Sequence, residues 1–184
     1  MSEIRQLAPA SAHSVDYMSI YTTMESPVGE LLLVGRASDR GVALTSVTMA
    51  GQRYAPAMRA GWRRDPAAFA EVTRQLAAYF AGELTTFSLE LAPRGTEFQQ
   101  RVWRALDTVP YGTTTTYGRL AAQLGLPRDR IQALGAAIGA NPLAIIRPCH
   151  RVIGSDGGMR GYAGGVERKQ QLLVHEGALL GASW

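Results

Sequence analysis

The sequence has a single cysteine, Cys149, in 184 residues. One cysteine cannot form a disulfide within the chain, and one thiol is too few for a structural zinc site with its usual ligands. The sequence therefore predicts neither a disulfide framework nor a bound metal. It leaves a free thiol whose role has to be explained.

Long apolar runs are also missing. No segment approaches the ~20 apolar residues that a membrane-spanning helix needs, and the first residues lack the apolar stretch of a signal peptide. We therefore expect a cytoplasmic protein with no membrane partner, in a compartment that keeps Cys149 reduced. The net charge of +4 suits a polyanionic partner, but an excess of this size is common and does not by itself indicate nucleic-acid binding.

The arrangement of hydrophobic residues predicts a mixed α/β (α+β) fold in two parts. We expect residues 1–18 to form a flexible leader, 19–92 a small scaffold domain of β-sheet and helix, and 93–184 a mostly helical domain. Short β-rich runs separated by turn residues indicate hairpin-like strands in the scaffold domain, at residues 21–24, 31–34 and 42–49.

A helix should follow these strands. Asp65 can cap its first turn, Pro66 suits the first helical position, and Gly82 can end it. Alternating apolar residues at 87–91 predict one further strand. This part of the chain contains no chemical motif, so we interpret it as a scaffold without metal.

The second part has the pattern of a helix-turn-helix. Thr96 can cap a first helix, which stops before Pro110. Two short helices at 117–124 and 129–139 are then separated by a glycine-containing break. An ordinary helical hairpin would show the same pattern.

The second helix of this pair contains two glycines, Gly135 and Gly139, set among alanines. A glycine inside a helix costs about 1 kcal/mol relative to alanine, so its presence calls for a reason. Small side chains give a smooth surface that another backbone can approach closely. That backbone could belong to a packed helix of the same chain or to DNA.

Cys149 lies in a segment typical of a reactive cysteine. Pro148 precedes it, His150 follows it, and Arg147 and Arg151 are close in sequence. Positive neighbours and a histidine base lower the pKa of a thiol, and the thiolate is the nucleophile. The alternative is a buried structural cysteine, since free cysteine is among the most buried residue types.

The segment 146–154 resembles the active-site signature of the O6-alkylguanine-DNA alkyltransferases, also called methylated-DNA–protein-cysteine methyltransferases. Other segments similar to this family follow its order, at 95–103, 110–113, 141–142, 161–165 and 168–177. The resemblance implies DNA repair by irreversible, single-turnover transfer of an alkyl group, most simply methyl, from O6-alkylguanine to Cys149. It further implies no cofactor, a monomer, and DNA contacted in its minor groove by the helix-turn-helix.

The resemblance also implies a relay of Glu176, His150, a water molecule and Cys149. Adjacent side chains of an extended segment point to opposite faces, so His150 needs a local turn or a bridging water to reach the thiol. Glu176 stands just before Gly177 at a predicted helix end, where the helix dipole disfavours a carboxylate. Orienting His150 would explain this acid, and we expect its charge to serve the chemistry with little effect on stability.

Three further residues match family positions that handle the substrate. Tyr117 matches the tyrosine that helps rotate the nucleotide out of the duplex. Tyr162 matches the tyrosine that contacts the leaving guanine, and Asn141 matches the hinge that connects the helix-turn-helix with the active-site segment. A core position is the alternative for both tyrosines, and a plain helix-ending role is the alternative for Asn141.

Two positions depart from the family pattern. Gln132 replaces the arginine that fills the gap left by the flipped base, and Arg147 replaces an aliphatic residue before Pro148. A charge beside the active-site segment is costly unless it is paired or solvated, so either the packing has changed there or Arg147 contacts an anion. We count both residues as candidate substrate or DNA contacts.

The same two departures fit an alternative function. A paralogue could use Cys149 on a non-duplex or small-molecule alkyl donor, and Gln132 and Arg147 would fit such a protein. A DNA-lesion-binding protein akin to the alkyltransferase-like proteins is a further alternative. Those proteins lack the cysteine, so the presence of Cys149 argues against it.

Overall fold

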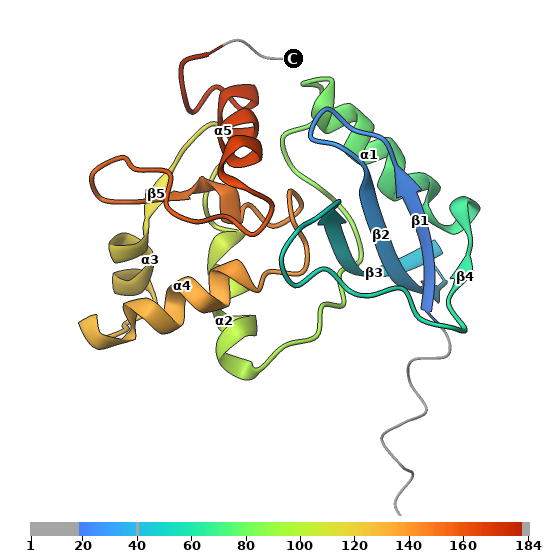
Figure 1. Ribbon diagram of the computed structural model, residues 1–184, viewed down its shortest axis with the longest axis horizontal. Coiled ribbons are helices and arrows are strands. Elements are labelled where there is room, and N and C mark those ends of the chain that lie inside the picture. The colour runs from blue at the N-terminus through green and yellow to red at the C-terminus, as the bar shows by residue number, and fades with distance from the viewer. Residues whose placement is uncertain (1–18, 40, 182–184) are drawn as a thin grey trace, which may run out of the picture.

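The computed structural model describes residues 19–39 and 41–181, and the expected leader at 1–18 lies outside them. Figure 1 shows two parts side by side, a β-sheet with a helix packed along it and a group of short helices. The predicted α+β fold is confirmed. Within the described ranges, no helix is long and apolar enough to cross a membrane.

Four strands make the sheet of the first part. They are β1 (Ser19–Met24), β2 (Leu31–Ser38), β3 (Gly41–Met49) and β4 (Arg63–Arg64), in the order β3-β2-β1-β4. The three predicted runs form the antiparallel strands β1 to β3, and β4 pairs in parallel with β1. β4 was not predicted because two exposed arginines carry no alternation of apolar and polar residues.

Helix α1 (Ala70–Phe80) packs along this sheet (Figure 1). A 3-10 turn, η1 (Pro66–Phe69), precedes it, and the Asp65 side chain caps that turn by accepting the N–H of Ala68 at 3.3 Å. The buried side chains of α1 recur at helical spacing, and they include Val72, Leu76 and Tyr79. The predicted helix and its cap are confirmed.

The strand predicted at 87–91 is wrong. Within this segment only Leu91 pairs with the sheet, in a single bridge to Leu44 of β3. The alternating apolar residues Phe87, Leu89 and Leu91 are partly buried against the core of the first part. Every second side chain is partly buried here because the chain passes over the core on its way to the second part. Such burial on one side does not require pairing with a strand.

The second part contains four helices, α2 (Glu97–Leu106), α3 (Tyr117–Gln123), α4 (Ile131–Gly139) and α5 (Val166–His175). Thr96 caps α2 as predicted, since its hydroxyl accepts the N–H of Gln99 at 3.2 Å and its own N–H donates to the Gln99 side chain at 2.9 Å. α3 and α4 are the predicted pair. α4 starts later than predicted because residues before it form a 3-10 turn, η2 (Arg128–Arg130).

Two short strands, β5 (Thr115–Thr116) and β6 (Val152–Ile153), pair in parallel within the second part. A 3-10 turn, η3 (Cys149–Arg151), leads directly into β6. This pairing joins the start of α3 to the cysteine segment, so Tyr117 and Cys149 are brought close together from positions far apart in the sequence.

The two parts meet along the edge of β3. Val47 of β3 donates its N–H to the carbonyl of Pro142 at 2.8 Å, and its carbonyl accepts the N–H of Ala144 at 3.0 Å. Residues 143–146 belong to the hydrophobic core of the first part, whereas Cys149 belongs to the core of the helices. The segment that carries the cysteine therefore crosses from one core to the other.

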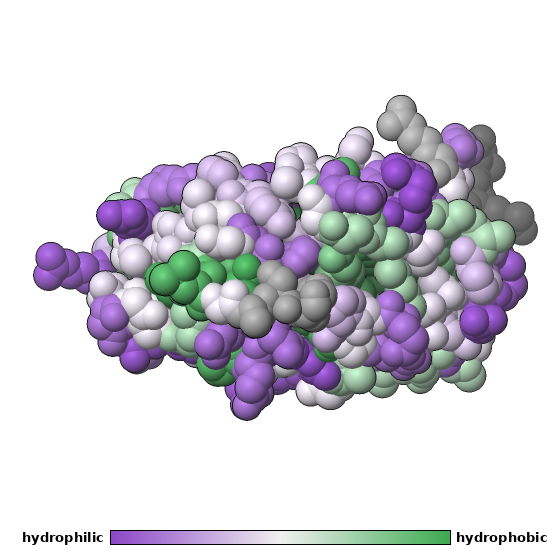
Figure 2. All heavy atoms as spheres, turned by 90° about the horizontal axis from the view of Figure 1, so that it is seen from above, coloured by the Kyte–Doolittle hydropathy of each residue, from purple (hydrophilic) through white to green (hydrophobic). Residues whose placement is uncertain are grey.

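Figure 2 shows a face on which hydrophilic residues are spread over both parts, with hydrophobic residues in smaller patches between them. Among the described residues, the exposed large hydrophobic side chains are those of Tyr54, Met58, Val166 and Leu180. Tyr54 is notable because it lines a pocket of about 1000 Å³.

Candidate active site

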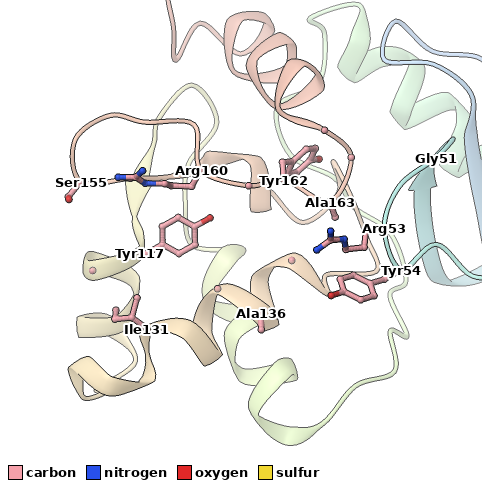
Figure 3. A pocket seen from close by; sticks show the side chains of 17 residues that line it. Gly51, Arg53, Tyr54, Tyr117, Ile131, Ala136, Ser155, Arg160, Tyr162 and Ala163 are labelled. Atoms are coloured by element: carbon pink, nitrogen blue, oxygen red, sulfur yellow. The ribbon is translucent and has the colours of Figure 1, made fainter.

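A pocket of about 1000 Å³ opens between α3, α4, the glycine-rich loop 157–165 and the loop that follows β3 (Figure 3). An adjoining cavity of about 30 Å³ shares Tyr117 and Tyr162 with it and is also lined by Cys149 and Asn141. The volume of this inner cavity is about that of one water molecule. The only thiol of the chain therefore lies next to a pocket open to solvent.

Asn141 holds the turn that carries the cysteine. It follows α4 closely and is buried. Its side-chain N–H groups donate to the carbonyl oxygen of Arg147 at 3.0 Å and to Cys149 Sγ at 3.1 Å, and its Oδ1 accepts the N–H of Leu143 at 3.1 Å. Within the turn, Ile145 has a φ of 71°, which is a true outlier for a β-branched residue. The hydrogen bonds of Asn141 thus hold a strained turn in place.

Burial raises the pKa of the Cys149 thiol above its ordinary value of 9.0. The hydrogen bond from Asn141 and the positive charge of Lys169 act in the opposite direction but do not outweigh burial. The prediction that positive neighbours lower this pKa is wrong, because burial outweighs them; Arg147 and Arg151 form ion pairs with Asp107 and Glu176. At neutral pH the thiol is protonated, so it needs a base to react.

His150 has the properties of such a base. It is fully buried in η3, and its Nε2 lies 2.7 Å from Glu176 Oε1. A carboxylate only accepts hydrogen bonds, so we assign the ring proton to Nε2 and a free lone pair to Nδ1. Nδ1 is buried and has no hydrogen-bond partner among the described residues. Burial lowers the pKa of His150 although Glu176 acts to raise it, so the ring is neutral at pH 7 and can accept a proton.

Glu176 has two partners besides the histidine. Arg151 donates from Nε to Oε2 at 2.7 Å and from Nη2 to Oε1 at 3.0 Å, and the hydroxyl of Tyr79 on α1 donates to Oε1 at 2.8 Å. Burial acts to raise the pKa of Glu176, but the hydrogen bonds from His150 and Arg151 and the positive charge of Arg151 lower it to about 2. The expectation that this charge has little effect on stability has to be revised, since removing it would leave Arg151 buried without its counter-ion.

The two predicted substrate tyrosines both line the pocket (Figure 3). Tyr117 is the first residue of α3 and borders the inner cavity as well. The hydroxyl of Tyr162 is buried and faces the sulfur of Cys149. Burial and the neighbouring Cys149 raise the pKa of Tyr162 well above 10.0, so this hydroxyl stays protonated and can donate a hydrogen bond.

The glycines of α4 border open space. A methyl group built on Gly139 would meet no atom within 4 Å, and one built on Gly135 would reach only the ring of Tyr117, at 4.0 Å. Tight packing against another helix of the chain therefore does not explain them. Both line the pocket together with Ala136, so the smooth face of α4 is available to a second molecule.

The two departures from the family pattern lie in different places. Gln132 is exposed near the start of α4 and is not among the residues that line the pocket, while Arg130 before it lies over the ring of Phe98 at 5.4 Å. Arg147 is buried, with its Nε 3.3 Å from Oδ1 of Asp107 at the end of α2. Arg147 lines neither cavity.

Several residues of the site were given no role by the sequence analysis. The buried Lys169 donates from Nζ to the carbonyl of Val152 at 2.6 Å, and burial lowers its pKa to about 8. Gln52 borders the inner cavity, and Arg53 and Tyr54 border the pocket. These three belong to the part predicted to be scaffold alone, and only the fold brings them to the cysteine.

Comparison with known proteins gives two family matches that together cover most of the described chain. Residues 19–93 match the 6-O-methylguanine DNA methyltransferase, ribonuclease-like domain, and residues 97–178 match the 6-O-methylguanine DNA methyltransferase, DNA binding domain. Methylated-DNA–protein-cysteine methyltransferases are similar over the same region. The one from Mycolicibacterium paratuberculosis is 53% identical over 156 residues, covering 85% of this chain and 91% of that protein. The one from Methanosarcina acetivorans is 46% identical over 158 residues, covering 86% and 98%.

Two crystal structures of proteins with related names are also similar to this chain in sequence and fold. A crystal structure of Mycobacterium tuberculosis OGT in complex with DNA is 50% identical, with a TM-score of 0.78, over 86% of this chain and 93% of that one. A crystal structure of Mycobacterium tuberculosis O6-methylguanine methyltransferase is 51% identical, with the same TM-score of 0.78, over 90% and 97%.

Proposed function

The chain belongs to the 6-O-methylguanine DNA methyltransferase family, and on that premise we propose that it repairs DNA by moving an alkyl group from O6 of guanine onto Cys149. One observation carries the proposal. The only thiol of the chain borders a pocket, 3.1 Å from the Asn141 amide and directly before a buried, neutral histidine. Because the thiol is buried, the guanine has to leave the base stack to reach it.

In the proposed reaction the sulfur of Cys149 attacks the alkyl carbon, so that an S–C bond forms and the C–O6 bond breaks. The Nδ1 of His150 takes the thiol proton through one bridging water, and Glu176 stabilises the resulting imidazolium. The electron pair of the broken bond stays on the guanine, and the Tyr162 hydroxyl donates a hydrogen bond to the departing base. The proton that His150 took from the thiol passes back through the water to the guanine anion, so the base leaves neutral and His150 returns to its neutral form. The thioether product is a poor leaving group and the chain has no second thiol, so each molecule reacts once and needs no cofactor.

We assign DNA binding to α3 and α4. The smooth face of α4 supports close approach to the sugar-phosphate backbone in the minor groove, and Tyr117 supports rotation of the nucleotide into the pocket. Gln132 offers a smaller planar group than arginine and no charge to fill the gap in the duplex. Arg147 supports the cysteine turn through its ion pair with Asp107, and we no longer assign it to DNA. We further propose that the protein acts as a monomer in the cytoplasm, where its thiol stays reduced.

The test is the intact mass of the protein after incubation with DNA that contains O6-methylguanine. We expect the mass to rise by one methyl group, found on Cys149 after proteolysis, with one equivalent transferred per protein molecule. Cys149→Ala should remain unmodified. Repeated turnover, or a methyl group on another residue, would overturn the proposal. Transfer from a small-molecule donor without transfer from DNA would favour the paralogue function.

A further inference from the structure

The loop that follows β3 forms one wall of the pocket, although it belongs to the first part of the chain. Gly51, Arg53 and Tyr54 line the pocket from this loop. The backbone N–H of Arg53 donates to the carbonyl of Ala163 at 3.0 Å. Ala163 follows Tyr162 in the glycine-rich loop, so this hydrogen bond ties Arg53 to the loop that holds the tyrosine facing Cys149.

The pocket is lined by two cations and by no acidic side chain. Arg160 is one of them, and it already forms an ion pair with Asp156 at 2.7 Å. Arg53 is the other. It is exposed, and its guanidinium forms no ion pair or side-chain hydrogen bond with the residues at 19–39 and 41–181. An unpaired cation at the mouth of a pocket without acids attracts an anion.

The direction of the Arg53 side chain agrees with this charge. Figure 3 shows its guanidinium directed over α4 into the pocket, with Tyr117 and Arg160 on the far side. Tyr54, the next residue, has a φ of 66°, which is uncommon for a residue other than glycine. Tyr54 is 71% exposed at the same rim. The loop thus presents a charged and an aromatic side chain side by side to whatever enters.

Resting on the function proposed above, we propose that Arg53 binds a phosphate of the DNA strand that carries the alkylated guanine. A nucleotide that turns into the pocket brings its flanking phosphates to the rim, where Arg53 stands. The planar guanidinium matches phosphate oxygens with two parallel N–H donors. Such a contact orients the strand without reading its sequence. The first part of the chain then takes part in substrate binding as well as in support of the site.

The test compares single-turnover reactions of wild-type protein and Arg53→Ala. One substrate is duplex DNA containing O6-methylguanine, measured at several salt concentrations. The other is free O6-benzylguanine, which has no phosphate. We expect the variant to react about five- to tenfold more slowly with the duplex, as for the loss of a charge-assisted contact at a surface. The dependence of log rate on log salt should become shallower by about 0.9, the value for one phosphate contact. The reaction with the free base should be nearly unchanged, and Arg53→Lys should recover part of the loss.

Arg64→Ala is the matched control, because Arg64 is an exposed arginine in β4 of the same part of the chain and does not line the pocket. It should react like the wild type. An Arg53→Ala protein that keeps the wild-type rate and salt dependence on the duplex, or that slows equally on the free base, overturns the proposal. Binding of unmodified duplex, measured by fluorescence anisotropy, tests the same contact without alkyl transfer. A wild-type protein that binds DNA through Arg53 but transfers no methyl group would refute the proposed repair function and leave the phosphate contact standing.

Discussion

Burial opposes ionisation of the Cys149 thiol, and three neighbouring side chains act against that effect in different ways. Asn141 donates a hydrogen bond to the sulfur, and Lys169 places a positive charge near it. His150 is a neutral base whose Nδ1 is free to accept a proton. Burial therefore keeps the thiol protonated in the free protein, and in the reaction proposed above the thiolate forms by proton transfer to His150.

The first prediction at the residue scale concerns Glu176→Gln. The amide keeps the size of the side chain but removes the charge that orients and supports His150, so alkyl transfer should slow by about a hundredfold or more. The same change leaves Arg151 buried without its counter-ion, which should lower the free energy of unfolding by about 3 kcal/mol. Single-turnover kinetics and urea unfolding measure the two effects separately. Wild-type kinetics in a stably folded variant would exclude Glu176 from the relay.

The second prediction concerns the pH dependence of stability. The pKa of His150 is lowered from 6.5 in the folded protein, so below that pH the unfolded state binds a proton that the folded state does not. The pKa of Glu176 is lowered from 4.5 to about 2, which adds a second loss below pH 4.5. In both intervals the unfolded state binds more protons, so the free energy of unfolding should fall as the pH falls.

Urea unfolding at a series of pH values measures this dependence. In His150→Asn the loss that begins near pH 6.5 should disappear, while the loss below pH 4.5 should persist in reduced form, because Arg151 still lowers the pKa of Glu176. The comparison concerns the slope against pH, so it holds even where the variant is less stable at every pH. An unchanged slope between pH 6.5 and pH 4.5 in this variant would show that His150 is not the group responsible.

At the scale of elements, helices and caps follow from short-range signals. Thr96 and Asp65 cap their helical segments as predicted, because a cap depends on residues three positions apart. The pairing of β5 with β6 was not predicted, because it joins residues that are far apart in the sequence. The wrong prediction of a strand at 87–91 also comes from the need for a distant partner. Alternation indicates burial on one side of the chain and does not identify a pairing partner.

The prediction at this scale concerns Gln132 on α4. Extruding a base costs a few kcal/mol, and an arginine inserted into the duplex offsets part of that cost by stacking and hydrogen bonding. Arg130 is held over Phe98, which makes Gln132 the side chain of α4 to test. Gln132→Arg should speed methyl transfer from duplex DNA and leave the reaction with free O6-benzylguanine nearly unchanged. Equal effects on the two substrates would mean that Gln132 acts on chemistry or folding.

At the scale of the whole molecule, the first part of the chain supports the candidate active site through direct contacts. The edge of β3 pairs with the residues that follow Asn141, and Tyr79 of α1 reaches Glu176. Residues 19–92, interpreted from the sequence as a scaffold alone, therefore also contact the segment that carries Cys149 and the side chain of Glu176. The division of the chain near residue 93 stays a prediction, because the two parts share a core at residues 143–146.

The prediction at this scale is that Tyr79→Phe weakens the connection between the two parts. The change removes the hydroxyl that donates to Glu176 at 2.8 Å and leaves the ring in place, so it should lower the free energy of unfolding by about 2 kcal/mol. Because Glu176 keeps His150 and Arg151, methyl transfer should slow far less than in Glu176→Gln. Tyr111→Phe is the control, since Tyr111 packs edge-on against Tyr79 without contacting Glu176 through a hydrogen bond. Equal losses of stability in both variants would argue against a specific role for the Tyr79 hydroxyl.

The sequence by itself predicted Cys149 as the nucleophile and, through the family resemblance, His150 and Glu176 as its relay. It also predicted most helices and strands, because these depend on neighbours a few positions away. Only the tertiary structure decided which charged side chains form ion pairs. It paired Arg151 with Glu176 and Arg147 with Asp107, and it brought Arg53 to the pocket mouth. It also showed that the pKa of Cys149 is raised, where the sequence predicted that it is lowered. Burial of the thiol depends on how two separate cores pack around the cysteine segment, and the residues beside it in the chain do not determine that packing.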